Sequence, residues 1–501
     1  MNTCPVLVVG AGPCGLTAAC ELLRHGTAVR IVDARPRPAP GSRAILLWPP
    51  QLALLADHGL LDEALALGRR PKAFTYGTGP RRLARFPFTT DTAPLVLPQH
   101  HTDRLLEEAL TARGARIERG LRATDVIQTP DEVRISLTDG NGRTSTIRTP
   151  WLIGADGTRS TVRTALGIPA TRTRAATRFL LAEGTLTPEP PATDIEYVLT
   201  PRGALLIAPL PDGRHRVAGT MDGAIGPDSE GLRAILRRSG RDLSMDDLTL
   251  LTEFTSQESL TQRMRTGRVF LVGDAAHTHY PVGGQGANLG MQDARNLAWK
   301  LAGVIDRRLC DAVLDTYDPE RRAVARQVLR MTGLVARVAL LGPPWNSARN
   351  LALKATAGVP ALQGWYTATL AGLRSPYPRT ALGAPPPERP RRPGRLSPAS
   401  AVGLPCPDWA RTQQPTITYR LVTRGVARSP LRARADELAH GHPLATRQHV
   451  SAPGEQCLLV RPDGYTACAA DTTRLTDVGR LLDDLTARPA EPRPTPTMED
   501  P

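Results

Sequence analysis

The stretch that decides the fold is VLVVGAGPCG, residues 6–15, close to the start of the chain. Its first four residues, Val6–Val9, form a short apolar run of the kind that is buried in a parallel sheet. A glycine-rich turn follows at once, and then an apolar repeat with helical spacing. This is the fingerprint of a dinucleotide site. Gly10 permits the tight turn, Gly12 lets the backbone approach a pyrophosphate, and Gly15 lets the helix pack closely on the strand.

The residues next to this turn extend the expected dinucleotide site. Pro13 opens the predicted helix, and a helix N-terminus carries partial positive charge that suits phosphate groups. Asp33 directly follows the next predicted strand, residues 28–32. An acidic side chain that binds ribose hydroxyls is expected at this place. Ala34 and Arg35 follow in the loop and are predicted to line the same site, although Asp33 would repel a 2′-phosphate there.

Two later stretches also combine glycine with aspartate. The first, GRVFLVGDAAH, spans residues 267–277, and PVGGQGAN, residues 281–288, follows it ahead of a predicted helix over residues 291–305. Glycines in front of a helix expose backbone N–H groups to a polar or anionic ligand edge. The second stretch, GADGTRSTVR, spans residues 154–163. The glycine fingerprint alone does not separate FAD from NAD.

In this order and at this spacing, the three motifs resemble those of the para-hydroxybenzoate-hydroxylase-like group A flavin monooxygenases. Within that group, the chain most resembles the bacterial aromatic polyketide hydroxylases. The resemblance runs from residue 5 to about residue 330 and resumes at LLVRPDGY, residues 458–465, which is similar to the C-terminal thioredoxin-like domain of such enzymes. It implies tightly but non-covalently bound FAD, with NAD(P)H and O2 as co-substrates. It also implies that Asp274 holds the ribityl chain of FAD.

The residue patterns and the resemblance together define a candidate cofactor site, with no metal. Its predicted cofactor-binding residues are Gly10, Gly12, Pro13, Gly15, Asp33, Ala34, Arg35, Arg43, Gln99, Asp156, Gly273, Asp274, Pro281, Gly284, Gln285, Gly286, Ala287 and Asn288.

Five side chains near these motifs carry more than one interpretation. By resemblance, Arg43 lies beside the flavin, where its cation would stabilise negative charge on the reduced ring; a surface salt bridge is the alternative. Gln99 matches a glutamine that contacts FAD, or else it is simply the first residue of a helix. Tyr280 is a candidate catalytic substrate contact, with packing the favoured interpretation. For His277 and His279, packing of the loop is favoured over catalysis.

The function that the resemblance implies is hydroxylation of an aromatic polyketide or a phenolic substrate, as in antibiotic biosynthesis. The flavin, reduced by NAD(P)H, would react with O2 to give a C4a-hydroperoxide that transfers its distal oxygen to an electron-rich ring. Baeyer–Villiger oxygen insertion, epoxidation and antibiotic-inactivating hydroxylation remain open on the same scaffold. Two further alternatives are a flavin reductase or dehydrogenase without oxygenation, and a non-catalytic binding protein that contains no flavin.

The chain is predicted to have an α/β fold. A Rossmann-like FAD-binding domain, residues 1–71, 98–174 and 256–382, is interrupted by a mainly antiparallel β substrate-binding domain, residues 72–97 and 175–255. Residues 383–398 form the expected linker, residues 399–487 a small thioredoxin-like domain, and residues 488–501 a disordered tail. The thioredoxin-like segment has no CxxC pair, which argues against a redox role.

Composition narrows the range of partners and compartments. The formal net charge is +15, but nearly all of the positive charge comes from scattered arginines, so we expect no nucleic-acid partner. The seven cysteines show no CxxC or metal spacing and no secretion signal is evident, which predicts a cytoplasmic protein with reduced thiols. No apolar stretch approaches about 18 residues, so no membrane span is expected. The predicted partner is a small-molecule substrate. The chain itself is expected to be a monomer or a homodimer.

Overall fold

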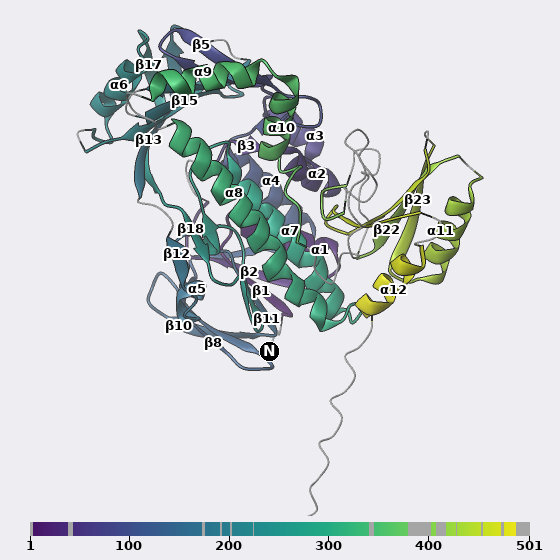
Figure 1. Cartoon of the computed structure of the whole chain (residues 1–501). Helices are drawn as coiled ribbons and strands as arrows, with labels where there is room; N and C mark the ends of the chain where they lie inside the picture. The colour runs from purple at the N-terminus through teal and green to yellow at the C-terminus, as the bar shows by residue number, and fades with distance from the viewer. Residues whose placement is uncertain are drawn as a thin grey trace, which may run out of the picture. The chain divides into compact units, whose positions relative to one another are not determined.

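The computed structural model describes residues 4–38, 44–172, 176–190, 193–200, 203–223, 225–339, 345–378, 402–406, 417–426, 428–451, 454–471 and 475–486. The chain forms two compact units (Figure 1). The first unit consists of Met1–Ala298, Asp318–Pro378 and Thr412–Pro415, and the second of Trp299–Tyr317, Arg379–Arg411 and Thr416–Pro501. The predicted linker, residues 383–398, and the predicted tail, residues 488–501, lie outside the described residues.

One sheet of the first unit is mainly parallel and carries the glycine fingerprint. Its strands are β1 (Val6–Val9), β2 (Val29–Asp33), β7 (Ile117–Arg119), β11 (Trp151–Gly154), β19 (Arg265–Thr266) and β20 (Val269–Leu271). Their order across the sheet is β19-β20-β11-β1-β2-β7, and β1 pairs in parallel with both β2 and β11. All four residues of β1 are buried, which explains why the sequence there is a continuous apolar run. This sheet is the Rossmann-like layer expected from the sequence.

A second sheet of the first unit is mainly antiparallel. Its strands are β4 (Ala73–Thr78), β5 (Arg81–Pro87), β13 (Thr177–Thr187), β14 (Asp194–Thr200), β15 (Gly203–Pro209), β16 (His215–Met221) and β17 (Ser244–Ser256). Their order is β17-β13-β16-β15-β14-β4-β5, and among these neighbours only β14 and β4 run parallel. The helix α6 (Ser229–Arg238) packs its Leu232 and Ile235 against this sheet. The segments around residues 72–97 and 175–255 therefore lie in one sheet although they are far apart in sequence.

The helices of the first unit show one clear difference from the sequence expectation. They include α1 (Pro13–Arg24), α2 (Pro49–Asp57), α3 (Leu61–Leu67), α4 (Gln99–Ala112), α5 (Thr161–Ala165), α7 (Gln285–Ile305), α8 (Tyr317–Ala339), α9 (Asn346–Ala357) and α10 (Pro360–Leu370), of which α7 and α8 each extend into the second unit. Gly59, with a φ of +75°, separates α2 from α3. However, α7 begins at Gln285 and not at Met291, so the expectation that Gln285–Asn288 precede the helix was wrong. The left-handed backbone ends at Gly284, which has a φ of +62°, and the chain after it is helical.

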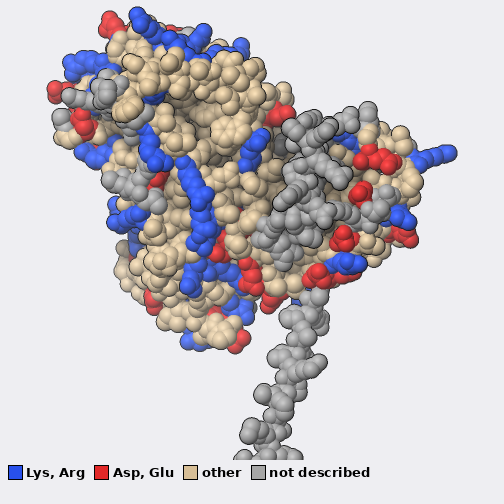
Figure 2. Space-filling view, viewed as in Figure 1, with Lys and Arg blue, Asp and Glu red and all other residues tan. Residues whose placement is uncertain are grey.

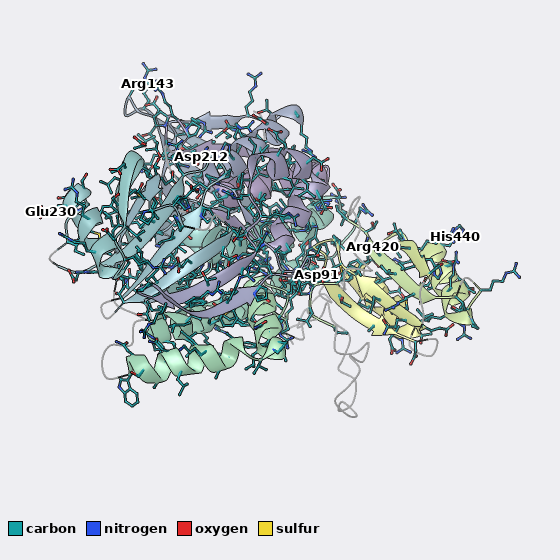
Figure 3. The ribbon with its side chains drawn as sticks, turned by 90° about the horizontal axis from the view of Figure 1, so that it is seen from above. Asp91, Arg143, Asp212, Glu230, Arg420 and His440 are labelled. Atoms are coloured by element: carbon teal, nitrogen blue, oxygen red, sulfur yellow. The ribbon has the colours of Figure 1, made fainter. Side chains whose placement is uncertain are left out.

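Several elements were not foreseen. A three-stranded sheet consists of β8 (Arg122–Gln128), β9 (Val133–Thr138) and β10 (Thr144–Thr149), and smaller pairings join β12 (Ala170–Arg172), β18 (Ser259–Thr261) and β21 (His277–Thr278), and β3 (Leu46–Leu47) with β6 (Leu95–Val96). β10 is largely exposed, so its sequence lacks the apolar alternation of a half-buried strand. Figure 3 shows Arg143, in the turn between β9 and β10, on the outside of this sheet.

The second unit contains a four-stranded sheet. Its elements are β22 (Tyr419–Gly425), α11 (Pro430–Gly441), β23 (Ala445–Ser451), β24 (Gln456–Val460), β25 (Thr466–Ala470) and α12 (Leu475–Thr486). The strand order is β23-β22-β24-β25, with β22 parallel to β23 and the other neighbours antiparallel. Val422, Leu458 and Val460 are buried in its core. These elements lie within residues 399–487, the range expected for a small C-terminal domain.

Charged side chains are spread over the surface of the first unit. Figure 2 shows basic and acidic groups interspersed with uncharged ones on the face in view. Several arginines are paired, including Arg30 with Glu118 and Arg85 with Asp194, both at 2.8 Å. In the described part of the chain, none of the helices has the length and apolar character needed to cross a membrane.

Candidate functional site

The three predicted motifs follow three neighbouring parallel strands. The glycine turn follows β1, Asp156 follows β11, and the Gly273–Asp274 pair follows β20. Backbone hydrogen bonds continue between the ends of these strands, from Ala155 N to Val9 O at 2.8 Å and from Val272 N to Gly154 O at 3.0 Å. The structure therefore brings the motifs together at the carboxyl edge of one sheet, which is where ligands of open α/β sheets bind.

The three glycines of the fingerprint differ in what they are needed for. Gly10 has a φ of +105°, and a Cβ there would lie 2.3 Å from the carbonyl oxygen of Ala155. A Cβ at Gly15 would lie 1.9 Å from the carbonyl oxygen of Gly10. By contrast, a Cβ built at Gly12 would have no heavy atom of the described residues within 4 Å apart from those of its chain neighbours. The fold itself thus requires two glycines, whereas the third leaves open space directly before Pro13, the first residue of α1.

Asp33 is buried and its carboxylate is crowded with donors. Oδ2 accepts a hydrogen bond from the Ala11 N–H at 2.7 Å, and Oδ1 accepts one from the Arg35 N–H at 2.8 Å. The guanidinium of Arg35 also donates to it at 3.1 Å. Burial alone would raise the pKa of Asp33, but these hydrogen bonds outweigh burial and lower it. Asp33 is therefore ionised at neutral pH, with Ala34 and Arg35 beside it.

Asp156 reaches the same edge, but its side chain is used within its own turn. The carboxylate accepts hydrogen bonds from Ser160 Oγ at 2.5 Å and from the Val162 N–H at 3.1 Å. These contacts satisfy a donor at the start of α5. The link to the next motif comes instead from Arg163, whose guanidinium donates to the carbonyl oxygen of Ala275 at 2.9 Å.

The Gly273–Asp274 pair lies in a single 3₁₀ turn, η1 (Gly273–Ala275). Gly273 has a φ of +60°, and a Cβ there would lie 2.6 Å from Sγ of Cys14, a residue of the fingerprint. The Gly273 N–H donates to Oδ2 of Asp293 at 3.1 Å. The side chain of Asp274 is exposed, so it is accessible to a ligand at the edge of the sheet.

The loop from Pro281 to the start of α7 is held by its own protein contacts. Tyr197 Oη accepts a hydrogen bond from the Gly283 N–H at 3.1 Å, and Trp48 Nε1 donates to the Gly283 carbonyl at 2.9 Å.

Asn288, in the first turn of α7, accepts a hydrogen bond from the Trp48 N–H at 2.8 Å and donates one to the carbonyl of Leu46 at 2.7 Å. The Gln285 amide donates to the carbonyl of Leu370 at 2.8 Å. Pro281 is exposed, and Gly286 and Ala287 lie in the first turn of α7. The amide side chains of Gln285 and Asn288 are therefore engaged with the protein backbone.

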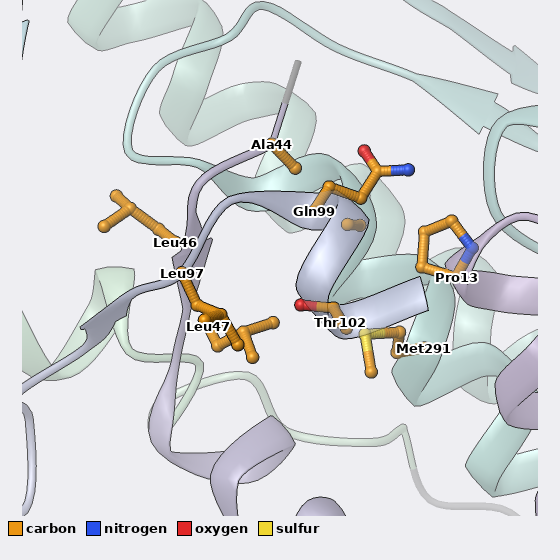
Figure 4. A pocket seen from close by; sticks show the side chains of 9 residues that line it. Pro13, Ala44, Leu46, Leu47, Leu97, Gln99, Thr102 and Met291 are labelled. Carbon is orange, nitrogen blue, oxygen red and sulfur yellow. The ribbon is translucent and has the colours of Figure 1, made fainter. Parts of the chain in front are cut away.

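A small pocket lies among these elements (Figure 4). It brings together residues from the fingerprint, from α4 and from the first turns of α7. Its lining residues are Pro13, Ala44, Leu46, Leu47, Leu97, Gln99, Thr102, Ala287 and Met291. Three of them, Pro13, Gln99 and Ala287, were predicted to bind the cofactor. A largely apolar wall with few polar groups is typical of a cofactor site.

Two polar groups near this pocket were not predicted from the sequence. Thr102 lines the pocket, and its Oγ1 is buried without a hydrogen-bond partner among the described residues. In the same part of the chain, Asp103 Oδ1 is likewise buried without a partner, while Oδ2 accepts from Gln99 Nε2 at 3.2 Å. Burial raises the pKa of Asp103 to about 7. The available signal was the helical spacing from Gln99, which places residues three and four positions later on the same side of α4.

The remaining candidates divide into packed and undescribed residues. Arg43 lies outside the described residues. Tyr280 is buried, its hydroxyl lies 2.5 Å from Thr177 Oγ1, and its ring packs edge-on against Phe179 with 6.4 Å between centroids. His277 Nε2 lies 2.6 Å from Oδ2 of Asp293, and His279 Nδ1 lies 2.8 Å from the carbonyl oxygen of Tyr280. These contacts agree with the packing interpretation that the sequence favoured for all three side chains.

Comparison with known proteins places this site in a wider context. Residues 3–332 match the model of the FAD binding domain family. The chain is 36% identical over 339 residues to 6-methylpretetramide 4-monooxygenase of Streptomyces rimosus, covering 65% of this chain but only 60% of that relative. It is 31% identical over 499 residues to 12-dehydrotetracycline 5-monooxygenase/anhydrotetracycline 6-monooxygenase of Streptomyces rimosus subsp. rimosus, covering 94% and 96% of the two chains. The solved structure of OxyS anhydrotetracycline hydroxylase from Streptomyces rimosus matches with a TM-score of 0.77 at 29% identity, covering 97% of this chain and 99% of that one.

Proposed function

This chain belongs to the FAD binding domain family, and we propose on that basis that it hydroxylates an aromatic polyketide or a phenolic substrate. It is an FAD-dependent monooxygenase, and NAD(P)H and O2 are its proposed co-substrates. One observation carries the proposal: the three motif turns follow the adjacent parallel strands β1, β11 and β20 and meet at one edge of the sheet. One of the similar proteins described above is named a hydroxylase, so hydroxylation is favoured over Baeyer–Villiger oxidation and epoxidation.

The fingerprint supports binding of the FAD pyrophosphate and ribose. The open space at Gly12 would admit a phosphate next to the backbone, and the positive N-terminal end of α1 would stabilise its charge. Asp33, ionised and fixed by Ala11 and Arg35, would accept hydrogen bonds from ribose hydroxyls. The exposed carboxylate of Asp274 would accept them from the ribityl chain.

The pocket supports placement of the rest of the cofactor. The Gln99 side chain and the unpartnered Thr102 Oγ1 are polar groups in an otherwise apolar wall, so they would orient polar atoms of FAD. The first turn of α7, which includes Ala287, presents backbone N–H groups that lack an intrahelical acceptor. When bound, FAD supplies the chemistry that transfers an oxygen atom from O2 to the substrate. The protein binds it, orients the substrate and excludes water.

A buried aromatic cluster, with rings from β4 and β14 of the antiparallel sheet, supports an aromatic substrate. Phe74 lies edge-on to Phe88 with 5.0 Å between ring centroids, and Tyr76 stacks on Tyr197 at 5.2 Å. The ring centroids of Trp48 and Phe74 lie 6.1 Å apart, and Trp48 Nε1 donates a hydrogen bond to the Gly283 carbonyl in the loop before α7. A planar, mostly apolar ring system would pack against these faces and be shielded from water beside the glycine loop. We infer that this cluster forms one wall of the substrate site.

The finer organisation is also part of the proposal. We assign residues 1–71, 98–174 and 256–382 to FAD binding and residues 72–97 and 175–255 to substrate binding. The βαβββα order of the second unit and its strand order β23-β22-β24-β25 support a thioredoxin-like domain over residues 399–487. The seven cysteines, which show no CxxC pair and no metal spacing, support a reducing, cytoplasmic location. A monomer or a homodimer is proposed, and light scattering of the purified protein distinguishes them.

An oxygen-uptake assay tests the function. The purified protein should carry about one FAD per chain. With NADPH or NADH, it should consume O2 faster when a tricyclic or tetracyclic phenol is present, and a product one oxygen atom heavier should appear by mass spectrometry. A colourless protein that takes up no added FAD would overturn the assignment. Flavin reduction without an oxygenated product, across the whole phenol panel, would instead indicate a reductase.

A further inference from the structure

A buried carboxylate on α7, that of Asp293, lies behind the Gly273–Asp274 turn. Asp293 is fully buried. Its Oδ2 accepts a hydrogen bond from the Gly273 N–H at 3.1 Å and lies 2.6 Å from His277 Nε2. Its Oδ1 accepts a hydrogen bond from Arg321 Nε at 2.7 Å. One side chain therefore contacts both ends of the segment from Gly273 to His277.

The backbone of the Gly273–Asp274 turn is also closely packed against α7 and Cys14. A Cβ built at Gly290 would lie 2.7 Å from the Gly273 Cα and 2.3 Å from Cys14 Sγ. The Gly273 backbone is thus packed between α7 and the fingerprint residue Cys14, with its one N–H bound to Asp293. Because backbone atoms pack so closely around this turn, it has a single conformation while its hydrogen bonds are intact.

Asp293 is in turn fixed from the other side. Arg321, on α8, is fully buried, and its guanidinium also donates to Tyr377 Oη at 3.3 Å and to the Leu289 carbonyl at 3.2 Å. The same tyrosine hydroxyl accepts from Asn296 Nδ2 at 3.1 Å. A buried carboxylate needs opposite charge and hydrogen bonds to remain ionised, and Arg321 supplies both. The carboxylate, the guanidinium and the turn therefore form one connected unit.

Asp274 itself has no such support. Its side chain is exposed, and within the described residues it makes no hydrogen bond or ion pair. The position of its carboxylate therefore depends on the backbone of the η1 turn, which Asp293 holds.

We propose that Asp293 is a positioning residue for FAD binding: by holding the Gly273 N–H, it fixes the turn so that the Asp274 carboxylate meets the cofactor. This inference rests on the proposed function. Asp293 does not touch the cofactor; it acts through Asp274. Replacing Asp293 should therefore weaken FAD binding by no more than replacing Asp274 does.

The test is a double-mutant cycle on the flavin-loaded protein. Asp293→Asn keeps the shape of the side chain but removes the charge that pairs with Arg321 and His277. Asp274→Ala removes the direct contact. The FAD dissociation constant is measured by ultrafiltration of the holoprotein and normalised to the folded fraction, with the visible absorbance spectrum of the flavin as a second readout. Asp131→Asn, at an exposed position in the turn between β8 and β9, is the matched control.

We expect Asp293→Asn to raise the dissociation constant about tenfold and to shift the flavin absorbance bands, and Asp274→Ala to raise it at least as much. The double variant should bind FAD no more weakly than Asp274→Ala alone, because Asp293 acts through Asp274. Strictly additive effects, or a folded Asp293→Asn protein with the wild-type dissociation constant and spectrum, would overturn the positioning role while leaving the proposed function intact. A wild-type protein that binds no FAD would overturn both.

A second variant covers the case in which Asp293→Asn does not fold. His277→Asn removes one contact of Asp293 and leaves Arg321 in place, so the buried charge stays paired. It should raise the FAD dissociation constant by a smaller factor, about threefold, and that rise should vanish in the Asp274→Ala background. A rise of the same size in both backgrounds would show that this cluster does not act through Asp274.

Discussion

The backbone N–H of Ala11 donates a hydrogen bond of 2.7 Å to Oδ2 of Asp33, across 22 residues of sequence. This bond joins the glycine turn after β1 to the acidic end of β2, so the two halves of the fingerprint are held in register before any ligand binds. The arrangement leaves the carboxylate ionised and buried at the edge of the sheet.

Replacing Asp33 with Asn should weaken FAD binding. Hydrogen bonds to a charged group contribute about 1.5–3 kcal/mol, so loss of the charge predicts a rise of roughly tenfold or more in the FAD dissociation constant. Titration of the protein with FAD, followed by flavin fluorescence, measures it. Asp91→Asn, at an exposed position labelled in Figure 3, is the control and should leave the constant unchanged. An unchanged constant in Asp33→Asn would contradict a contact with ribose.

Substitutions at Gly12 and Gly15 should have different effects, the first on FAD content and the second on stability. At Gly12 the backbone is extended, with a φ of −82°, and a Cβ would contact none of the described residues beyond its chain neighbours, so Gly12→Val should fold with a near-normal Tm but contain no FAD. At Gly15 a Cβ would lie 1.9 Å from a carbonyl oxygen, so Gly15→Ala should destabilise the fold by about 1–3 kcal/mol. Calorimetry and the flavin absorbance per chain separate the two effects. Full FAD content in Gly12→Val would show that the open space is not a phosphate site.

Asp103 should make the flavin-free protein less stable as the pH rises. Burial raises its pKa from 3.8 to about 7 in the folded state, so the folded state holds the proton more tightly than the unfolded state does. The contribution of Asp103 to the free energy of unfolding is therefore fully present below pH 3.8 and is lost progressively as the pH rises through about 7. Asp103→Asn should raise the Tm at pH 8 more than at pH 5. An equal gain at both pH values would exclude titration of this carboxyl.

Tyr197→Phe should disturb the glycine loop without emptying the cofactor site. The variant removes the acceptor of the Gly283 N–H, and an unmet buried donor costs about 1–3 kcal/mol. We expect FAD to remain bound, the flavin spectrum to shift and turnover to fall severalfold. Tyr366→Phe is the matched control, because it removes another hydroxyl of the same aromatic cluster, one bonded to Tyr76 and not to the loop. Equal effects of the two variants would contradict a specific role for the Gly283 contact.

The local elements were predictable because their causes are local. The apolar run Val6–Val9, the glycines after it and the acid at the end of the next strand define a strand–turn–helix–strand unit through residue spacing alone. The break at Gly59 follows from the backbone preference of glycine, and the resemblance in the three motifs indicates the FAD family. The exposed β10 and the early start of α7 were missed, because their residues carry no clear hydrophobic period.

What each side chain does at the site was decided only by the tertiary structure. The sequence marks Asp156, Gln285 and Asn288 as polar and well placed, but all three bind atoms of the protein itself. Conversely, nothing in the sequence near residue 273 reveals that Asp293, 20 positions later, accepts its N–H, or that Tyr197 holds Gly283 from 86 positions away. Spacing along a chain fixes short-range geometry, whereas a hydrogen bond between distant residues exists only after packing has set where their backbones lie.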